Sequence, residues 1–394
     1  MKSNNEDLSY IINHLGEDHS TYFNAVAPPI IQTSNFMFET VEHMRTAFKD
    51  EMSTYIYSRG VNPTVDILRK KLAALDSAED ALVFNCGSAA VFAGLLANVK
   101  AGDHVLSVHH PYSWTTHTFD QILSRFGVTI TYADGSDTES FLTHVQPNTS
   151  LIFLESPNSW FLDIQDLGAI AEFAKKRGIV TMIDNTYCTP LYQRPIEYGI
   201  DLVMQTATKY IGGHSDTLGG VLTGSKKMME KIFKSEYLAI GSGIQPMNAW
   251  LLLRGLRTLP ARVDRIDQST KKVLEYLKQE DKVESIIFPH DPGFPQYELA
   301  KKQMKKAFGL LSFYIKAQKV EEIEKFCNSL KCFRMAVSWG GHESLVIPKC
   351  SGIDRSAFDP KEPTHRLIRL YIGLEDADFL IQDLQQGLSG IGSL

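Results

Sequence analysis

Two short apolar runs, each followed by a charged side chain, most constrain what this chain can fold into. Residues 179–183 (IVTMI) lead directly to Asp184, and residues 200–204 (IDLVM) lead through a short polar stretch to Lys209. Short runs rich in β-branched and aliphatic residues, bounded by polar turns, are typical of buried parallel strands. Catalytic groups of open α/β sheets lie just past the carboxyl ends of such strands, so the pattern predicts both charged side chains there.

An acid and a lysine at neighbouring strand ends suit one cofactor. Pyridoxal phosphate is bound as a Schiff base to a lysine, and an aspartate or arginine contacts its pyridine nitrogen. A carboxylate keeps that nitrogen protonated, so the ring can take up the electrons left when a proton leaves the substrate α-carbon. Taken alone, a helix-capping Asp184 and a surface Lys209 would be the commoner interpretation, because most aspartates and lysines are exposed. The residues around them decide against it.

These surroundings carry a resemblance to a known family. Residues 184–186 (Asp-Asn-Thr), 207–210 (Ala-Thr-Lys-Tyr) and 213–216 (Gly-His-Ser-Asp) resemble the cofactor site of the pyridoxal-phosphate-dependent enzymes of cysteine and methionine metabolism. The family includes cystathionine β- and γ-lyases, cystathionine γ-synthase and methionine γ-lyase. The resemblance extends over almost the whole chain, and it implies pyridoxal 5'-phosphate bound to Lys209 with Asp184 at the pyridine nitrogen.

The resemblance also implies the fold. We expect the α/β fold of aspartate aminotransferase (fold type I), with a mostly parallel sheet in a large domain and a smaller C-terminal α/β domain. Residues 27–34 are punctuated by proline and cannot be helical, so the start of the chain is expected to be irregular. The resemblance implies that residues 1–55 form an N-terminal arm that contacts a neighbouring subunit. Residues 56–244 would bind the cofactor, and residues 245–394 would form the second domain.

Other elements follow from periodicity. The expected helices span 164–177, 248–258 and 270–277, and the expected strands of the second domain span 310–315, 335–339 and 367–373.

Small residues and threonines are candidates for the cofactor phosphate. Gly87 and Ser88 follow a predicted strand and begin a helix, where free backbone N–H groups and the helix dipole favour an anion. Close helix packing would explain these small residues equally well. Thr206 and Thr208 flank Lys209, and on a strand their hydroxyls would face the same side.

Three aromatic or basic side chains complete the predicted cofactor site. Tyr57 and Arg59 can both donate hydrogen bonds to phosphate, although a solvated loop pair is an equal interpretation. The resemblance implies that they reach the cofactor of the adjacent subunit, in a homotetramer of dimers with shared active sites. It also implies that Tyr112 stacks on the cofactor ring and takes part in proton transfer; ring stacking contributes about 0.5 to 1.5 kcal/mol.

Arg369 is the leading candidate for binding substrate. It is a charge inside an apolar run, and a buried guanidinium is costly unless it is paired or binds an anion. The family has an arginine here that grips the substrate α-carboxylate, and Ser338, Trp339 and Tyr57 are further substrate-binding candidates by resemblance. The family's contact to the cofactor phenolic oxygen falls on Asn158 or Ser159.

Two segments point to β-elimination within the family. Residues 155–159 (Glu-Ser-Pro-Asn-Ser) and 338–345 (Ser-Trp-Gly-Gly-His-Glu-Ser-Leu) are similar to those of bacterial cystathionine β-lyases. Members acting at the γ-carbon often carry a glutamate just before that serine, where this chain has Val337. The expected activity is therefore a carbon–sulfur β-lyase that cleaves L-cystathionine to L-homocysteine, pyruvate and ammonia, with Lys209 as the general base.

Two alternatives remain open. The first is another enzyme of the family, namely methionine γ-lyase, cystathionine γ-lyase or γ-synthase. The second is a non-catalytic relative that kept the fold, which would have little reason to retain Lys209, Asp184, Tyr112 and Arg369 together.

Composition and charge exclude several other classes of function. The net charge of −6 does not indicate the overall basic charge that favours nucleic-acid binding. The five cysteines are scattered along the chain and do not suggest a disulfide framework. The pair His109-His110 lacks a nearby third metal ligand. The first twenty residues do not resemble a secretory signal, and no apolar run is long enough to span a membrane. We therefore expect a reduced, cytoplasmic enzyme without membrane or nucleic-acid partners.

Overall fold

The computed structural model describes residues 7–392, and the chain divides into two compact units. Unit 1 comprises Met1–Ser156, Ile164–Gly212 and Asp216–Arg257, and unit 2 comprises Pro157–Asp163, Gly213–Ser215 and Thr258–Leu394. Residues 1–6 and 393–394 of these ranges lie outside the described part. The last change from unit 1 to unit 2 along the chain falls between Arg257 and Thr258, and the domain boundary before residue 245 stays a prediction. The described part of the predicted arm, residues 7–55, belongs to unit 1.

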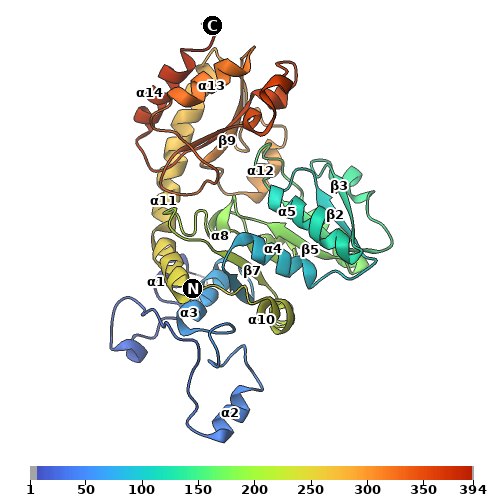
Figure 1. Cartoon of the computed structure of the whole chain (residues 1–394), viewed down its shortest axis with the longest axis vertical. Coiled ribbons are helices and arrows are strands. Elements are labelled where there is room, and N and C mark those ends of the chain that lie inside the picture. Colours follow the sequence, from blue (N-terminus) through green and yellow to red (C-terminus); the bar gives the residue numbers. More distant parts are fainter. Residues whose placement is uncertain (1–6, 393–394) are drawn as a thin grey trace. The chain divides into compact units, whose positions relative to one another are not determined.

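Unit 1 is built on a mixed seven-stranded sheet (Figure 1). Its strands are β1 (Asp80–Phe84), β2 (His104–Val108), β3 (Thr129–Ala133), β4 (Thr149–Glu155), β5 (Val180–Asp184), β6 (Leu202–Gln205) and β7 (Gly220–Gly224). The order across the sheet is β1-β7-β6-β5-β4-β2-β3, and β7 alone runs antiparallel to its neighbours. The predicted mostly parallel sheet is confirmed. The two runs that opened the sequence analysis form adjacent parallel strands, with Asp184 opposite Met204.

Both faces of this sheet are covered by helices, which explains why most residues of its strands other than β3 are buried. Met182 packs into the core on the face covered by α4 (Gly87–Leu96), and the next residue, Ile183, packs into the core on the face covered by α7 (Leu167–Arg177). The helix predicted from residue 164 begins at Leu167, because the Asp166 side chain caps it by accepting the N–H of the third helical residue at 3.1 Å.

The other α-helices of unit 1 are short apart from α3. They are α1 (Leu8–Asn13), α2 (Val41–Ala47), α3 (Pro63–Leu75), α5 (Ser113–His117), α6 (Thr138–Leu142), α8 (Thr189–Tyr192), α9 (Lys226–Ile232) and α10 (Leu238–Ile240).

A buried charge network holds the start of the arm against α3. The ammonium group of Lys71 donates to the carbonyls of Ile11 and Ile12 at 3.0 Å and pairs with Glu17 at 3.0 Å. Glu17 also pairs with Arg257 at 3.1 Å. Because the side chains of Lys71 and Glu17 are each only 1% exposed, neither charge could be left alone without a large desolvation cost.

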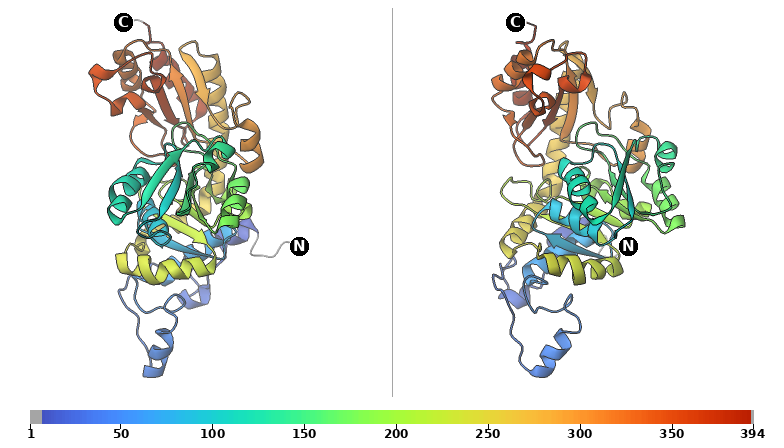
Figure 2. Two further views of the ribbon diagram at one scale, coloured as in Figure 1. Left: turned by 90° about the vertical axis from the view of Figure 1, so that its right-hand side faces the viewer. Right: turned by 45° about the vertical axis from the view of Figure 1, so that its right-hand side comes forward.

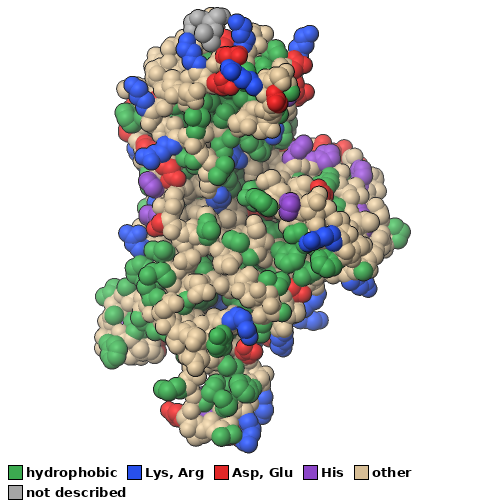
Figure 3. All heavy atoms as spheres, in the orientation of Figure 1, with side chains coloured by type: hydrophobic (Ala, Val, Ile, Leu, Met, Phe, Trp, Pro, Cys, Tyr) green, Lys and Arg blue, Asp and Glu red, His purple; other side chains and the backbone are tan. Residues whose placement is uncertain are grey.

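The rest of the arm projects from the sheet and its covering helices, with α2 at its end (Figures 1 and 2). Hydrophobic side chains gather on its surface (Figure 3). Phe23 is 100% exposed and Met37 is 96% exposed, and Val41 and Phe48 are exposed as well. Clustered exposed apolar side chains of this kind typically mark an interaction surface.

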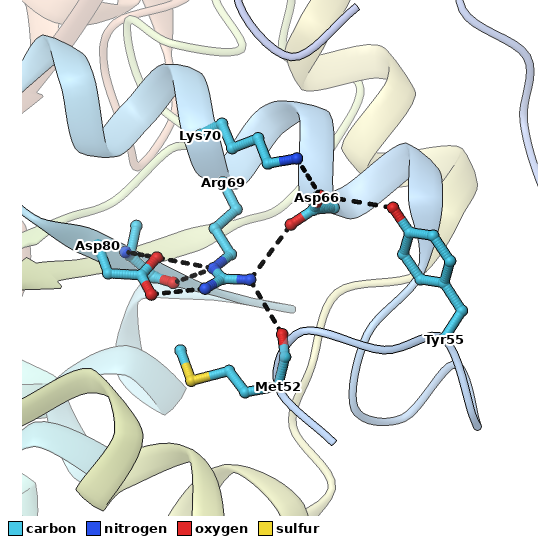
Figure 4. Close-up of polar contacts among 7 residues, drawn as sticks. Met52, Tyr55, Asp66, Arg69, Lys70 and Asp80 are labelled. Carbon is cyan, nitrogen blue, oxygen red and sulfur yellow. Dashed lines mark hydrogen bonds and ion pairs between the residues drawn. The ribbon is translucent and has the colours of Figure 1, made fainter. Parts of the chain in front are cut away.

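Arg69 connects the inner end of the arm to α3 and to the start of β1 (Figure 4). Its Nε donates to Asp80 Oδ1 at 2.8 Å, and its Nη1 donates to Asp66 Oδ1 at 3.2 Å and to the carbonyl of Met52 at 3.3 Å. Lys70 and Tyr55 also contact Asp66. The segment just before Tyr57 and Arg59 is therefore tied to the first strand of the sheet.

Asp76, the residue that caps α3, anchors the end of β6. Gln205 Nε2 donates to both carboxylate oxygens at 2.8 Å, and Thr223 Oγ1 donates to Oδ2 at 2.9 Å. Burial raises the pKa of Asp76 to about 7, although hydrogen bonds from Thr223 and Gln205 and the charge of Arg194 lower it. Gln205 is thus fixed immediately before the turn that carries Lys209.

Unit 2 contains a five-stranded sheet in the order β10-β11-β12-β9-β8. Its strands are β8 (Val283–Ile287), β9 (Leu310–Ile315), β10 (Arg334–Met335), β11 (Leu345–Pro348) and β12 (Leu367–Tyr371), and its helices include α12 (Tyr297–Gln303), α13 (Val320–Ser329) and α14 (Ala377–Leu388). The pair β10 and β11 is parallel, and the other pairs are antiparallel. The strand predicted at 335–339 shrinks to β10, because Ser338 and Gly340 have φ of 92° and 86°, which interrupts extended backbone.

A single long helix, α11 (Pro246–Gln279), replaces the two helices predicted at 248–258 and 270–277. Pro260 lies inside it and removes one backbone hydrogen bond. The helix nevertheless continues, because Leu256, Leu259 and Val263 are all fully buried around that position, and burial of an apolar stripe outweighs one lost bond. No helix within residues 7–392 is long and apolar enough to cross a membrane.

We predict that Arg69→Met lowers the free energy of unfolding by about 3 to 5 kcal/mol, because removing one partner leaves the buried Asp80 carboxylate uncompensated. Urea unfolding followed by circular dichroism would measure the change.

Arg45→Met is the matched control. Arg45 pairs with Glu42 on the arm with both side chains largely exposed, and such pairs contribute less than about 1 kcal/mol. Equal losses in the two variants would contradict a structural role for Arg69.

We predict that Asp76 makes stability fall with rising pH. The unfolded carboxyl loses its proton near its ordinary pKa, whereas the folded one keeps it until about pH 7. Folding stability is therefore lost progressively between about pH 4 and pH 7, by up to about 4 kcal/mol, and no further above that range. Unfolding of wild type and Asp76→Asn across this range would show a pH-dependent difference; parallel curves would contradict the assignment.

Candidate active site

Lys209 lies in a turn just past the end of β6. Its backbone N–H donates to the carbonyl of Thr206 at 3.1 Å. Ala207 and Tyr210 are fully buried and hold the turn from both sides, while Lys209 itself is half-buried. The lysine is thus fixed at its base, with a side chain that reaches beyond the strand end.

The expectation that Thr206 and Thr208 lie on a strand is wrong. β6 ends at Gln205, so the two hydroxyls are placed by the turn and not by strand alternation. Thr208 Oγ1 accepts the N–H of Gly219 at 3.0 Å and donates to the carbonyl of the same residue at 3.3 Å. Its hydroxyl thereby closes the turn that carries Lys209.

Asp184 ends β5 with its carboxylate buried, at 7% exposure. The Thr186 N–H donates to Oδ1 at 2.9 Å, and the Thr186 hydroxyl donates to the same oxygen. Burial raises the pKa of Asp184, whereas the bonds from Thr186 and the positive charge of Lys209 lower it. A cation bound against this carboxylate would keep it ionised and would itself be stabilised.

Thr186 connects the acid to the lysine turn. Besides donating to Asp184, its hydroxyl oxygen accepts the N–H of Thr206 at 2.8 Å. One side chain therefore sets the position of the turn relative to the carboxylate, which makes Asp184 and Lys209 parts of one rigid group.

Gly87 begins α4 against this same turn. A Cβ at position 87 would lie 2.3 Å from Thr206 Oγ1, so only glycine allows this approach. The N-cap residue, Cys86, makes no side-chain bond to the helix. The first N–H groups of α4, including that of the exposed Ser88, therefore lack a side-chain cap beside Thr206, as suits an anion.

Tyr112 is placed by a buried acid on the neighbouring strand. Its backbone N–H donates to Glu155 Oε2 at 2.7 Å. Glu155 ends β4, is 4% exposed, and stands opposite Asp184 in the register. The side chain of Tyr112 is 45% exposed, so its ring is presented beyond the strand ends.

Tyr57 and Arg59 lie on the loop between the arm and α3. Both side chains are exposed, and the guanidinium carbon lies 5.6 Å from the Tyr57 ring centroid. Among the described residues, no hydrogen bond joins either side chain to Lys209, Asp184 or Thr206. Within one chain these two residues are therefore a separate, outward-facing pair.

In unit 2, Arg369 is buried on β12 at 8% exposure. Its Nη1 donates to the carbonyl of Ser159 at 3.2 Å, and its guanidinium lies 4.9 Å from the centroid of the Trp160 ring. The segment that carries Ser159 and Trp160 is organised by Asn158, whose Oδ1 accepts three N–H groups, from residues 160, 161 and 162.

The loop from Ser338 to Gly341 is strained and buried. Ser338 has a φ of 92°, which is unfavourable for a residue with a side chain and is often found at functional positions. Trp339 is only 9% exposed. Tyr371 Oη donates to the carbonyl of Gly341 at 2.8 Å and so fixes the loop to β12.

Comparison with known proteins identifies the family. A family model described as Cys/Met metabolism PLP-dependent enzyme matches residues 10–389. The chain belongs to this family. It is 35% identical over 381 residues to the L-methionine gamma-lyase of Pseudomonas putida and 37% identical over 383 residues to that of Treponema denticola, with 95% of each chain covered in both cases. It is also 35% identical over 374 residues to the cystathionine gamma-lyase of Bacillus subtilis, covering 93% of this chain and 95% of the relative.

Solved structures agree with this assignment. The chain matches metB from Corynebacterium glutamicum with a TM-score of 0.90 and 31% identity, covering 99% of each chain. It matches a putative O-acetylhomoserine (thiol)-lyase from Campylobacter jejuni with a TM-score of 0.89 and 28% identity, covering 97% of this chain and 100% of the other, which carries a pyridoxyl-lysine phosphate. The predicted family and the fold type of pyridoxal-phosphate enzymes are confirmed.

Pyridoxal phosphate is the cofactor of this Cys/Met metabolism enzyme, and the residues present fit it. The uncapped start of α4 at Gly87 suits the phosphate, and the buried carboxylate of Asp184 suits a protonated pyridine nitrogen. The turn that carries Lys209 contacts Gly87 through Thr206, and it is connected to Asp184 through the hydrogen bonds of Thr186.

Sequence reasoning assigned no role to Thr186 or Glu155. Both lie at or just past strand ends next to Asp184, and this position alone could have marked them as candidate site residues. Their partners, Thr206 and the Tyr112 backbone, are distant in sequence, so the bonds themselves could not be inferred.

We predict that Thr186→Val weakens binding of pyridoxal phosphate about tenfold. Valine keeps the shape of threonine but removes the bond to the Asp184 carboxylate, and a hydrogen bond to a charged group contributes about 1.5 to 3 kcal/mol. Titration of the apoenzyme with cofactor, followed by absorbance, measures the dissociation constant.

Thr181→Val, on β5, is the control, since the Thr181 hydroxyl donates to Asp201 at 2.9 Å and not to Asp184. Equal cofactor affinity in Thr186→Val and wild type would show that the Thr186 bond does not support the site.

Proposed function

We propose that this pyridoxal-phosphate-dependent carbon–sulfur lyase eliminates at the γ-carbon, acting on L-methionine or L-cystathionine. The observation that carries the proposal is the similarity, over about 95% of the chain, to proteins named L-methionine gamma-lyase and cystathionine gamma-lyase. The β-elimination expected from sequence motifs is less well supported than this alternative.

Lys209 would act as the general base. Bound pyridoxal phosphate supplies an electron sink for the charge that develops at the substrate α-carbon. Lys209 would take the α-proton, and for γ-elimination it must release that proton before it takes one from Cβ, so its amine must be neutral before each step. Asp184 would hold the pyridine nitrogen in its protonated form, which requires the carboxylate to remain ionised despite its burial.

Other side chains would orient the reactants. Arg369 would bind the α-carboxylate, as a bidentate guanidinium suits that group, and Ser338 and Trp339 would shape the same region of unit 2. Tyr112 would stack on the cofactor and assist proton transfer to the leaving thiolate. Together these residues supply binding, orientation and proton transfer.

We also propose that the active site is shared between subunits of a tetramer. Tyr57 and Arg59 face outward from their own chain, and the adjacent arm exposes Phe23 and Met37. Packing of the arm on a second subunit would bury these apolar side chains and would deliver the two donors to a neighbouring phosphate.

Cystathionine β-lyase activity is the second candidate, and Val337 favours it. Family members acting at the γ-carbon often have a glutamate at this place, whereas Val337 is apolar and 84% exposed. Under the γ-lyase proposal, the same neutral side chain would suit methionine, whose distal methyl group needs no charged partner.

We predict that the purified holoenzyme releases 2-oxobutyrate, with methanethiol from L-methionine or cysteine from L-cystathionine. Chromatographic identification of the keto acid and the thiol together decides the reaction. Pyruvate with homocysteine as the sole products would establish β-elimination and overturn the proposal.

Lys209→Ala is the control for chemistry at this site. Loss of the base and of the cofactor linkage should reduce turnover by several orders of magnitude, while Lys301→Ala, at a lysine that lies over Tyr297 on α12, should keep full activity.

A further inference from the structure

Lys349 lies near Arg369 in unit 2. In the register of β11 and β12, Ile347 stands opposite Arg369, and Lys349 follows two residues later at the start of a short helix, η7 (Lys349–Gly352). β11 ends at Pro348, so Lys349 follows directly after the strand that pairs with the strand of Arg369.

Trp160 brings the two cations together. The Lys349 ammonium nitrogen lies 4.5 Å from the centroid of the Trp160 ring, and the Arg369 guanidinium carbon lies 4.9 Å from the same centroid. Lys349 also lies 5.6 Å from the Phe161 ring. One indole thus contacts both positive groups, and its ring faces attract cations.

Two like charges in this position are costly unless an anion joins them. Arg369 is buried and Lys349 is half-buried. Burial lowers the pKa of Lys349, and the charge of Arg369 lowers it further. Within residues 7–392 no carboxylate forms an ion pair with Lys349, and aromatic faces offset only part of the cost of desolvating an ammonium group.

The charged groups of the neighbouring segments have contacts of their own. η9 (Pro363–Arg366) packs against η7 and carries His365 and Arg366. Arg366 is paired with Glu284. The nearby acid Asp163 accepts a hydrogen bond from Asn158 Nδ2 at 2.9 Å.

We propose that Lys349 is a second carboxylate-binding residue, which acts with Arg369 on the substrate α-carboxylate while Trp160 holds both cations in place. The proposal rests on the proposed function, in which Arg369 binds that carboxylate. An anion between a guanidinium and an ammonium group gains two charge-assisted contacts and relieves the repulsion between them. Lys349 then determines how tightly an amino-acid substrate is held, and takes no part in proton transfer.

The test uses 3-(methylthio)propanoate, which has the carboxylate and thioether of methionine but lacks the amine. It cannot react, so its affinity for the holoenzyme reports the carboxylate site alone. Isothermal titration calorimetry should show binding about tenfold weaker to Lys349→Met than to wild type, and Lys349→Arg should restore most of the affinity. Unchanged affinity in Lys349→Met would overturn the proposal.

Steady-state kinetics separate binding from chemistry. Lys349→Met should raise KM for the amino-acid substrate about tenfold and change kcat less than twofold. A loss confined to kcat, or a loss that Lys349→Arg does not restore, would assign Lys349 a packing role instead. Lys301→Met is the matched control, because Lys301 lies 5.1 Å from the Tyr297 ring centroid in the same unit but on α12.

The two proposals can fail separately. If wild type releases pyruvate, γ-elimination is wrong, but calorimetry with the unreactive carboxylate still decides the role of Lys349. If 2-oxobutyrate is formed and Lys349→Met binds the carboxylate as wild type does, the role of Lys349 is wrong and the γ-lyase proposal stands.

Discussion

The arrangement of unit 1 depends on a carboxylate buried at the end of a parallel strand. Asp184 is removed from water, which disfavours its charge, and it is held by Thr186 with Lys209 as a nearby positive charge. The pairing of β5 with β6 brings these groups together from segments about twenty residues apart. A site built in this way requires both faces of the sheet to be packed, because only then are the strand ends rigid.

Other buried polar groups also fix segments of unit 1 in place. Asp76 fixes Gln205, the residue before the Lys209 turn, and Arg69 fixes the segment before Tyr57. Each carries an electrostatic cost that the surrounding bonds offset, so each is sensitive to loss of a partner. Asp76 thus supports the turn that carries Lys209, and Arg69 supports the loop that carries Tyr57.

The candidate substrate-binding residues are held in a different way from Asp184 and Lys209. Arg369 and Lys349 are cations placed against one tryptophan, in a sheet that is mainly antiparallel. Motif similarity around Val337 and Trp339 indicated β-elimination, whereas relatives over the whole chain are named γ-lyases. A few residues near a substrate can vary while the framework for the cofactor stays the same, so similarity over the whole chain carries more weight in the proposal than these local motifs.

From the sequence alone, the apolar runs placed Asp184 and Lys209 near strand ends, and the resemblance of the motifs around them to a known family implied the fold class and the cofactor. The sequence misplaced Thr206 and Thr208 on a strand, predicted two helices at 248–258 and 270–277 where α11 is continuous, and placed a strand where Ser338 turns the chain. Only the tertiary structure decided that Thr186 joins Asp184 to Thr206, that Glu155 positions Tyr112, and that Lys349 shares Trp160 with Arg369. These contacts join residues from different strands and loops, and burial and side-chain geometry in three dimensions select them.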